Sequence, residues 1–430
     1  WIEAIPYTRN VNKLKRVLKS PLMYGANETA ELEDITLPRY IRITDFNNNG
    51  ILQDDTFKSL PLEKADGYYL KDGDILFARS GATVGKTFQF KNYNGRACFA
   101  GYLIKASVNS YKILSDYLYY YTQSPAYDNW KNIIFTQATI QNISATKYDY
   151  LEISYPSIDE QKIIVKFLDK TCDSIDKAVE LKQKQIEKLD DLRKSIIHNA
   201  VTKGLDASVE MKDSGIEWLG KIPKHWEVVK LKRFLISPLM YGANEIAEFD
   251  DVDLPRYLRI TDFDENGNLR EDTFKSLPID KAEGYYLKTG DVLFARSGAT
   301  VGKTFQFKNY NGKACFAGYL IKASVNETKL LSNYLYYFTK SPSYDSWKNN
   351  IFTQSTIQNI SATKYDYLPL SVPEIKEQKQ IVEYLDDKLD KILKIKENLQ
   401  KQIEKLQDYR KSIIHECVTG KRRITEKDIL

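Results

Sequence analysis

The stretch Phe77-Ala78-Arg79-Ser80-Gly81-Ala82-Thr83-Val84-Gly85-Lys86-Thr87 occurs a second time, without change, at residues 294–304. The sequence around it repeats as well, and Gly25 becomes Gly242, a shift of 217 residues. This shift holds without a gap from Trp1 and Trp218 to Thr202 and Thr419. The repeat is far longer than the unit of a solenoid. We therefore predict two equivalent domains, each followed by a long polar helix.

Short stretches rich in β-forming residues and bounded by turns predict strands at 39–43, 75–79, 87–90 and 97–100. A helix is predicted at 115–124 and again at 332–341, each ending before a proline. The predicted fold class is α+β, with two near-identical globular domains separated by two long helices.

From residue 159 to residue 200 the chain has no Pro or Gly, and its apolar residues recur in steps of three and four, interrupted by Lys182 and Arg193. Such spacing is typical of a coiled coil. The predicted seam consists of Leu168, Cys172, Ile175, Val179, Ile186, Leu189 and Ile196, with Leu385, Leu389, Ile392, Leu399, Ile403, Leu406 and Ile413 in the second copy. Since the chain leaves the first domain along one helix and must return along the other, we expect an antiparallel coiled coil with pseudo-two-fold symmetry.

These patterns divide the chain into a globular domain at 1–155, a helix at 156–202 and a linker at 203–217. A second globular domain follows at 218–372, then a second helix at 373–420 and a tail at 421–430. A leader similar to residues 211–217 is expected before Trp1, because Trp218 is preceded by one.

The composition is that of a globular protein, with 42% hydrophobic and 28% charged residues and a net charge of +5. The charge is compatible with nucleic acid without being diagnostic of it. The four cysteines show no CxxC spacing, which favours a reduced cytoplasmic setting and makes a metal site unexpected. No apolar run is long enough to span a membrane.

The glycine-rich stretch from Gly81 to Lys86 resembles a phosphate-binding loop, but it is one residue too short and a strand is predicted after it. A turn that exposes backbone N–H groups beside Arg79 and Lys86 could still hold a nucleic-acid phosphate. The acidic pair Glu33-Asp34 returns as Asp250-Asp251 and is interpreted as a solvated turn rather than a metal site.

Residues 1–155 contain no histidine, so a Ser-His-Asp or Cys-His site within the repeated domain is excluded. His198 and His415 are interpreted as helix-end residues. We predict no catalytic residue, no metal and no cofactor in this chain, which indicates a binding protein.

Three segments resemble the specificity subunits of type I restriction–modification systems. They are the opening Gly215-Ile216-Glu217-Trp218-Leu219-Gly220, the segment Glu160-Gln161-Lys162-Ile163-Ile164 with its second copy, and the helix end Leu192-Arg193-Lys194-Ser195-Ile196-Ile197 with its second copy. The resemblance covers the whole chain. It implies two target recognition domains that bind double-stranded DNA, and helices that dock two methyltransferase subunits and, through the complex, restriction subunits. It also implies that AdoMet, ATP and Mg²⁺ are used by those partners.

Members of this family usually carry dissimilar recognition domains, whereas the two domains here are almost the same. Equal domains related by a two-fold axis predict an inverted-repeat target whose half-site centres lie about one helical turn, ~10–10.5 bp, apart. The alternative is a stand-alone duplicated DNA-binding regulator, which would bind its target without a partner.

Candidate DNA contacts are polar residues of predicted turns that are the same in both copies. They are Tyr24, Asn27, Arg42, Thr44, Asp45, Arg79, Ser80, Thr83, Lys86, Gln137, Thr139 and Gln141, with Tyr241, Asn244, Arg259, Thr261, Asp262, Arg296, Ser297, Thr300, Lys303, Gln354, Thr356 and Gln358. Arg79 is the first choice for a base contact, Ser80 and Lys86 suit phosphates, and Arg42 could instead pair with a nearby carboxylate.

Overall fold

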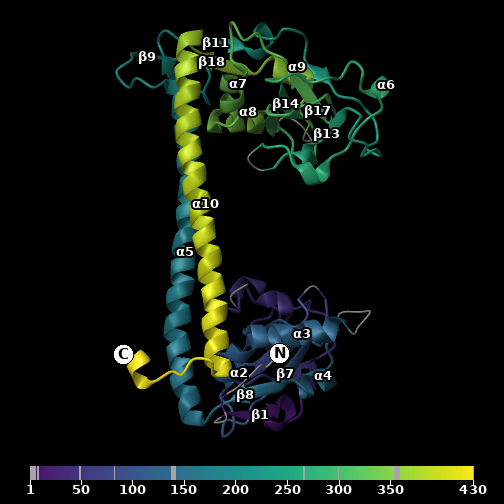
Figure 1. Cartoon of the computed structure of the whole chain (residues 1–430), viewed down its shortest axis with the longest axis vertical. Coiled ribbons are helices and arrows are strands. Elements are labelled where there is room, and N and C mark those ends of the chain that lie inside the picture. Colours follow the sequence, from purple (N-terminus) through teal and green to yellow (C-terminus); the bar gives the residue numbers. More distant parts are fainter. Residues whose placement is uncertain are drawn as a thin grey trace. The chain divides into compact units, whose positions relative to one another are not determined.

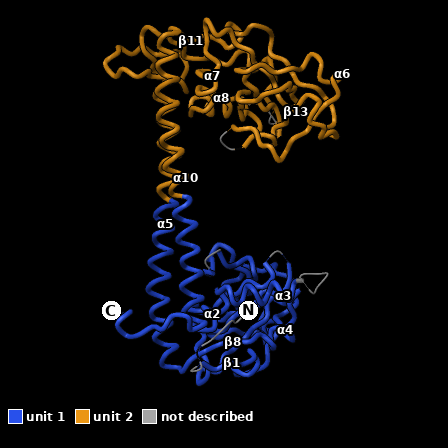
Figure 2. Tube along the Cα trace, in the orientation of Figure 1, with its two compact units in different colours: residues 1–183, 400–430 blue, residues 184–399 orange. Residues whose placement is uncertain are grey.

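The computed structural model describes residues 6, 9–47, 50–81, 83–136, 142–264, 267–298, 300–352 and 359–429. The chain forms two compact units, residues 1–183 with 400–430, and residues 184–399 (Figure 2). The two long helices, α5 (Ile158–Lys203) and α10 (Ile375–Thr419), therefore each contribute one part to each unit. None of the helices described here is long and apolar enough to cross a membrane.

A four-stranded antiparallel sheet forms the centre of each unit. In the first unit its order is β2 (Met23–Tyr24), β7 (Leu103–Ala106), β4 (Ile75–Ala78) and β5 (Thr87–Gln89). The second unit repeats this order with β12 (Met240–Tyr241), β17 (Leu320–Ala323), β14 (Val292–Ala295) and β15 (Thr304–Gln306).

The central strand β4 is buried on both faces, which explains its unbroken apolar sequence. Ile75 and Phe77 pack in one apolar cluster with tyrosines of α2 (Ser115–Thr122) and α3 (Pro125–Thr136). Leu76 and Ala78 pack in a second cluster on the other face. This alternation follows from the two-residue period of a strand.

Shorter elements complete each unit. The further strands are β1 (Asn10–Lys13), β3 (Arg39–Ile41), β6 (Ala97–Phe99), β8 (Glu152–Tyr155), β9 (Met211–Asp213), β10 (Lys221–Pro223), β11 (Glu227–Lys230), β13 (Arg256–Leu258), β16 (Ala314–Phe316) and β18 (Pro369–Val372). Strands β1 and β8 pair antiparallel, β3 and β6 pair parallel, and the second unit repeats both pairs. The short helices are α1 (Leu62–Ala65), α4 (Ala145–Asp149), α6 (Ile279–Ala282), α7 (Ser332–Phe338), α8 (Pro342–Phe352) and α9 (Ala362–Asp366).

The α+β class is confirmed, and the predicted strands are present with ends one or two residues shorter. The predicted helices are also present, as α2 and as α7 (Ser332–Phe338), and both end before the proline. The sequence analysis missed a further helix, α3, which begins at Pro125. Proline suits the first turn of a helix, whose N–H groups have no partner within the helix. The same happens at Pro342, where α8 begins.

Helices α5 and α10 run antiparallel within each unit (Figure 1). In the first unit Asp176 accepts a hydrogen bond from Arg410 Nε at 2.9 Å and Lys182 donates to Gln402 at 2.5 Å. In the second unit Lys396 donates to Asp190 at 2.6 Å. All fourteen predicted seam residues are buried or half-buried. The ends of the seam also serve the domain cores: Leu168, Cys172 and Ile413 belong to the first core and Leu385 to the second.

Candidate nucleic-acid interface

One end of the central sheet gathers candidate side chains from four separate segments. Tyr24 ends β2, Tyr102 precedes β7, Arg79 follows β4 and Lys86 precedes β5, and the antiparallel register brings these positions to the same end. We call Tyr24, Arg79, Ser80, Thr83, Lys86 and Tyr102 the strand-end cluster, with Tyr241, Arg296, Ser297, Thr300, Lys303 and Tyr319 in the second unit.

The segment from Asn142 to Ala145 joins the strand-end cluster from far along the chain. Ser80 and Asn142 form an isolated bridge, and the N–H of Ile143 donates to the carbonyl of Arg79 at 2.9 Å. The N–H of Ala145 donates to the hydroxyl of Tyr24 at 2.9 Å. Among the predicted contacts, Gln137, Thr139, Gln141, Gln354, Thr356 and Gln358 lie outside the described residues; the first three directly precede this segment in the sequence.

The guanidinium of Arg79 stacks on an aromatic ring. It lies over the ring of Tyr24, 4.8 Å from the centroid, and Arg296 lies over Tyr241 at the same 4.8 Å. The Nε atoms of both arginines are buried and have no acceptor within the part of the chain that the structure describes. A planar, oriented guanidinium with unused N–H groups matches the two acceptors on a guanine edge.

The glycine-rich turn uses its own backbone donors. The N–H groups of Val84, Gly85 and Lys86 donate to carbonyls of Gly81, Ala78 and Thr83 at 3.1, 2.7 and 2.9 Å. The predicted grip on a phosphate by exposed N–H groups therefore does not apply to these three, and the exposed side chain of Lys86 remains the phosphate candidate.

The absence of a side chain at Gly85 leaves room for the side chain of Lys131 against this turn. The φ of Gly85 is +78°, and a Cβ placed there would lie 2.4 Å from Cδ of Lys131. Lys131 is half-buried and pairs with Asp128 at 2.7 Å. Sequence reasoning missed Lys131 and Tyr102, although both are unchanged in the second copy as Lys348 and Tyr319. Tyr102 and Tyr319 are each 64% exposed, which is unusual for a tyrosine beside a sheet.

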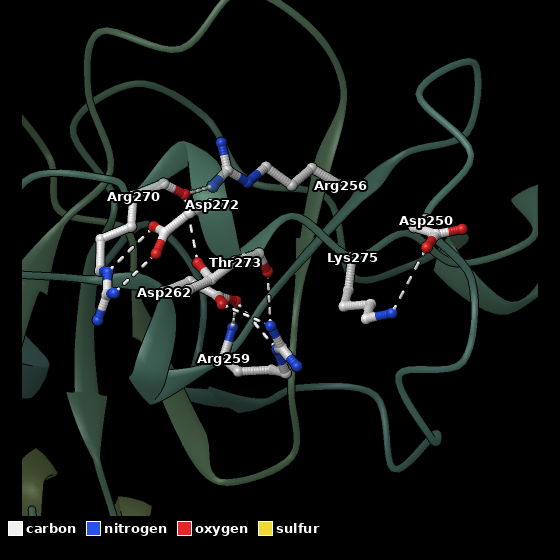
Figure 3. A network of polar contacts seen from close by, with 8 residues as sticks. All are labelled: Asp250, Arg256, Arg259, Asp262, Arg270, Asp272, Thr273 and Lys275. Atoms are coloured by element: carbon white, nitrogen blue, oxygen red, sulfur yellow. Dashed lines mark hydrogen bonds and ion pairs between the residues drawn. The ribbon is translucent and has the colours of Figure 1, made fainter. Parts of the chain in front are cut away.

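Arg42 and Asp45 form a structural pair. The fully buried carboxylate of Asp45 accepts from the Arg42 guanidinium at 2.6 Å and from the Arg42 N–H at 2.7 Å. Arg42 also donates to the carbonyl of Thr56 at 2.7 Å. Figure 3 shows the equivalent contacts of Arg259 with Asp262 and Thr273.

A buried, paired carboxylate has no free acceptor for a base. Asp45 and Asp262 are therefore assigned a structural role in place of the predicted DNA contact, and Arg42 and Arg259 hold them.

Two other predicted residues are exposed. Asn27 lies next to the strand-end cluster, because the N–H of Gly101 donates to the carbonyl of Ala26 at 2.7 Å. Thr44 precedes Asp45 in the short helical turn of the structural pair.

The acidic turns carry surface ion pairs. Lys58 binds Glu33 and lowers the pKa of that carboxyl, and Lys275 lies 3.8 Å from Asp250 (Figure 3). Within the described residues, no group of three or more His, Cys, Asp or Glu side chains is placed to hold a metal ion.

Comparison with known proteins identifies the family. A model of the type I restriction modification DNA specificity domain matches residues 13–190 and again residues 223–405. The MjaVIII specificity subunit of Methanocaldococcus jannaschii is 24% identical over 374 residues, which cover 83% of this chain and 80% of that protein. The EcoKI specificity subunit of Escherichia coli is 26% identical over 282 residues, covering 63% and 57%.

Two solved structures share the fold. A chain from a type I R-M system has a TM-score of 0.75 at 14% identity and covers 98% of this chain and 100% of its own. The HsdS subunit from Thermoanaerobacter tengcongensis has a TM-score of 0.52 at 15% identity, covering 98% and 99%. With two matches to the family model and this shared fold, the chain belongs to the family of type I restriction–modification DNA specificity subunits.

Proposed function

We propose that each strand-end cluster binds one half of a bipartite DNA target, and that the two half-sites form an inverted repeat. The observation that supports this most directly is the duplicated Arg79–Tyr24 stack, which has the same residues and the same distance in both units. Two domains with the same contact residues prefer the same bases. Equal half-sites in opposite orientation, about one helical turn (~10–10.5 bp) apart, form a palindrome.

The cluster divides the tasks of binding between its residues. Arg79 and Arg296 supply base-specific donors, while the exposed Lys86 and Lys303 neutralise phosphates. Tyr24 orients the arginine, and exposed Tyr102 offers an aromatic face beside it. Specificity subunits are non-catalytic, so methylation and cleavage, with AdoMet, ATP and Mg²⁺, fall to partner subunits.

The long helices offer two equivalent places for those partners. Leu192 and Tyr409 occupy the same position of the repeat, and they are 48% and 51% exposed although both are large and apolar. An apolar side chain exposed at the same place in both copies supports the docking of two methyltransferase subunits. Restriction subunits would join through that complex.

A selection of bound sequences from random duplexes tests this function. The chain is incubated with the pool alone and together with its methyltransferase, at one stated salt concentration. We expect enrichment of a single gapped sequence only when the methyltransferase is present. Equal enrichment by the chain alone would instead support a stand-alone regulator.

A further inference from the structure

The two units differ in charge around one tyrosine, Tyr119 in the first and Tyr336 in the second. In the first unit Lys91 pairs with Asp116 at 2.7 Å, and Arg410 pairs with Asp176 at 2.9 Å. The second unit keeps both cations, as Lys308 and Arg193, but has Asn333 and Leu393 where the carboxylates stood. Two cations of the second unit have therefore lost the partners that the first unit supplies.

A third difference adds a cation at the same place. Gln123 of the first unit donates to the hydroxyl of Thr87 at 2.9 Å, whereas its counterpart is Lys340. The ammonium of Lys340 donates to the carbonyl of Thr304 at 2.6 Å and lies 4.8 Å from the ring centroid of Tyr336. Lys308 lies 6.0 Å from the same centroid.

The charges around Lys340 are mostly of its own sign. Burial, together with Arg193 on α5, Lys348 on α8 and Lys303 before β15, lowers the pKa of Lys340 to about 7, and Asp345 acts in the opposite direction. Asp345 is itself paired with Lys348 at 2.7 Å.

One carboxylate of the second unit faces this tyrosine and is engaged elsewhere. Burial raises the pKa of Tyr336, and Asp264, which stands where the first copy has Asn47, raises it further. It accepts hydrogen bonds from the backbone and side chain of Asn268 at 2.7 and 3.1 Å. Within the residues described, Arg193, Lys303, Lys308 and Lys340 have no ion-pair partner.

We propose that Arg193, Lys303, Lys308 and Lys340 form an anion site that the first unit lacks, and that its ligand is a phosphodiester of the DNA backbone. The site adjoins the strand-end cluster because Lys303 belongs to both. Four cations without an ion-pair partner among the described residues suit a phosphate, which carries one negative charge and several acceptor oxygens. The two recognition domains then prefer the same bases, but the second domain binds the DNA backbone more tightly than the first.

The first experiment probes the anion site without DNA, so it does not depend on the proposed function. Sulfate is the probe, because its charge is constant between pH 6 and pH 8.5, and the melting temperature of the full chain is measured at constant ionic strength. We expect sulfate to raise the melting temperature of the wild type and to have this effect strongly reduced in Lys340→Gln and Leu393→Asp, which install the residue types of the first unit. Equal sulfate effects in wild type and Lys340→Gln would overturn the site.

Matched changes in the first unit provide the control. Gln123→Lys alone leaves the Asp176–Arg410 and Asp116–Lys91 pairs intact and should add little sulfate response. Gln123→Lys with Asp176→Leu should create one. The sulfate response of the wild type should also weaken from pH 6 to pH 8.5 as Lys340 loses its proton, whereas Lys340→Gln should show no such trend.

The second experiment, which rests on the proposed function, identifies the phosphodiester as the ligand. The affinity of the complex with the methyltransferase for a duplex is measured across a range of KCl concentrations. Loss of one phosphate contact makes the slope of log K against log salt shallower by about 0.9. We expect this change in Lys340→Gln and little change of the slope in Gln123→Lys, where the neighbouring cations keep their carboxylate partners.

Each outcome of the second experiment has one meaning. An unchanged slope together with a lost sulfate response would show that the site binds an anion other than a DNA phosphate, which overturns the DNA assignment. Failure of every variant and the wild type to bind duplex would contradict the proposed function, while the sulfate result would still decide whether the site exists.

Discussion

Replacing both Arg79 and Arg296 with alanine should abolish sequence preference while leaving the fold intact. A bidentate arginine–guanine contact contributes about 1–3 kcal/mol of discrimination, so two independent half-sites lose about 2–6 kcal/mol together. That range corresponds to roughly 30-fold to 10⁴-fold in relative affinity for target over non-target DNA. The fold loses only a cation–π stack in each domain, about 0.5–1 kcal/mol each. No acceptor loses its donor at Nε, because neither Nε makes a hydrogen bond within the described residues.

The assay is fluorescence anisotropy of the complex with target and scrambled duplexes, beside urea unfolding of the same variants. Arg79→Lys with Arg296→Lys is the matched control, since lysine keeps the charge but lacks the planar fork. It should retain affinity for scrambled DNA and still lose discrimination. Full discrimination in the double alanine variant would refute the role assigned to the arginines, and a large loss of stability would refute the account of their free donors.

Three further predictions concern stability. Arg9 donates to the carbonyls of Val418 and Cys417 at 2.6 and 2.9 Å and to the hydroxyl of Tyr117 at 2.9 Å. Arg9→Ala therefore leaves buried acceptors at the end of α10 without this donor. It should lower the free energy of unfolding by about 2–3 kcal/mol in urea, and a loss below 0.5 kcal/mol would contradict this. Gly85→Ala places a Cβ against Lys131 at a φ of +78°. It should cost about 1–2 kcal/mol more than the control Gly67→Ala, because Gly67 has a φ of +82° but nothing within 4 Å of an added Cβ. Because the pKa of Lys340 is lowered from 10.5 to about 7, the unfolded chain binds more protons between these values, and wild-type stability should rise with pH across that window. Lys340→Gln should remove this rise and be more stable near pH 6–7 by about 1–2 kcal/mol, less than the full shift implies because the lysine is partly exposed; parallel stability–pH curves for the two proteins would contradict it.

The repeat made much of the architecture predictable. Two domains, the α+β class, the antiparallel helices and the seam positions all follow from a fixed shift and an apolar period. These features depend on local sequence, on length and on chain direction. The position of Arg79 directly after a strand was also predictable, because a strand that ends in Arg-Ser-Gly places the arginine at a turn. Its contact with a base stays a prediction.

The arrangement of the site was not predictable, because it depends on pairing between distant segments. Tyr24 and Ala145 are far apart in the sequence, and only the strand register and the hydroxyl contact bring them together. Asp45 was misassigned because a turn position does not reveal burial, and its partner Arg42 lies three residues earlier. Tyr102 carries no polar pattern that marks it, and its exposure is visible only in the structure.

The most direct test of matched recognition domains is to map the methylated adenines in the genome of the host. We predict one gapped sequence whose two halves are inverted copies of each other, with methylated adenines on both strands at equivalent positions. A motif with two different halves, or with its halves in direct repeat, would contradict the claim that two equal domains bind DNA in opposite orientations.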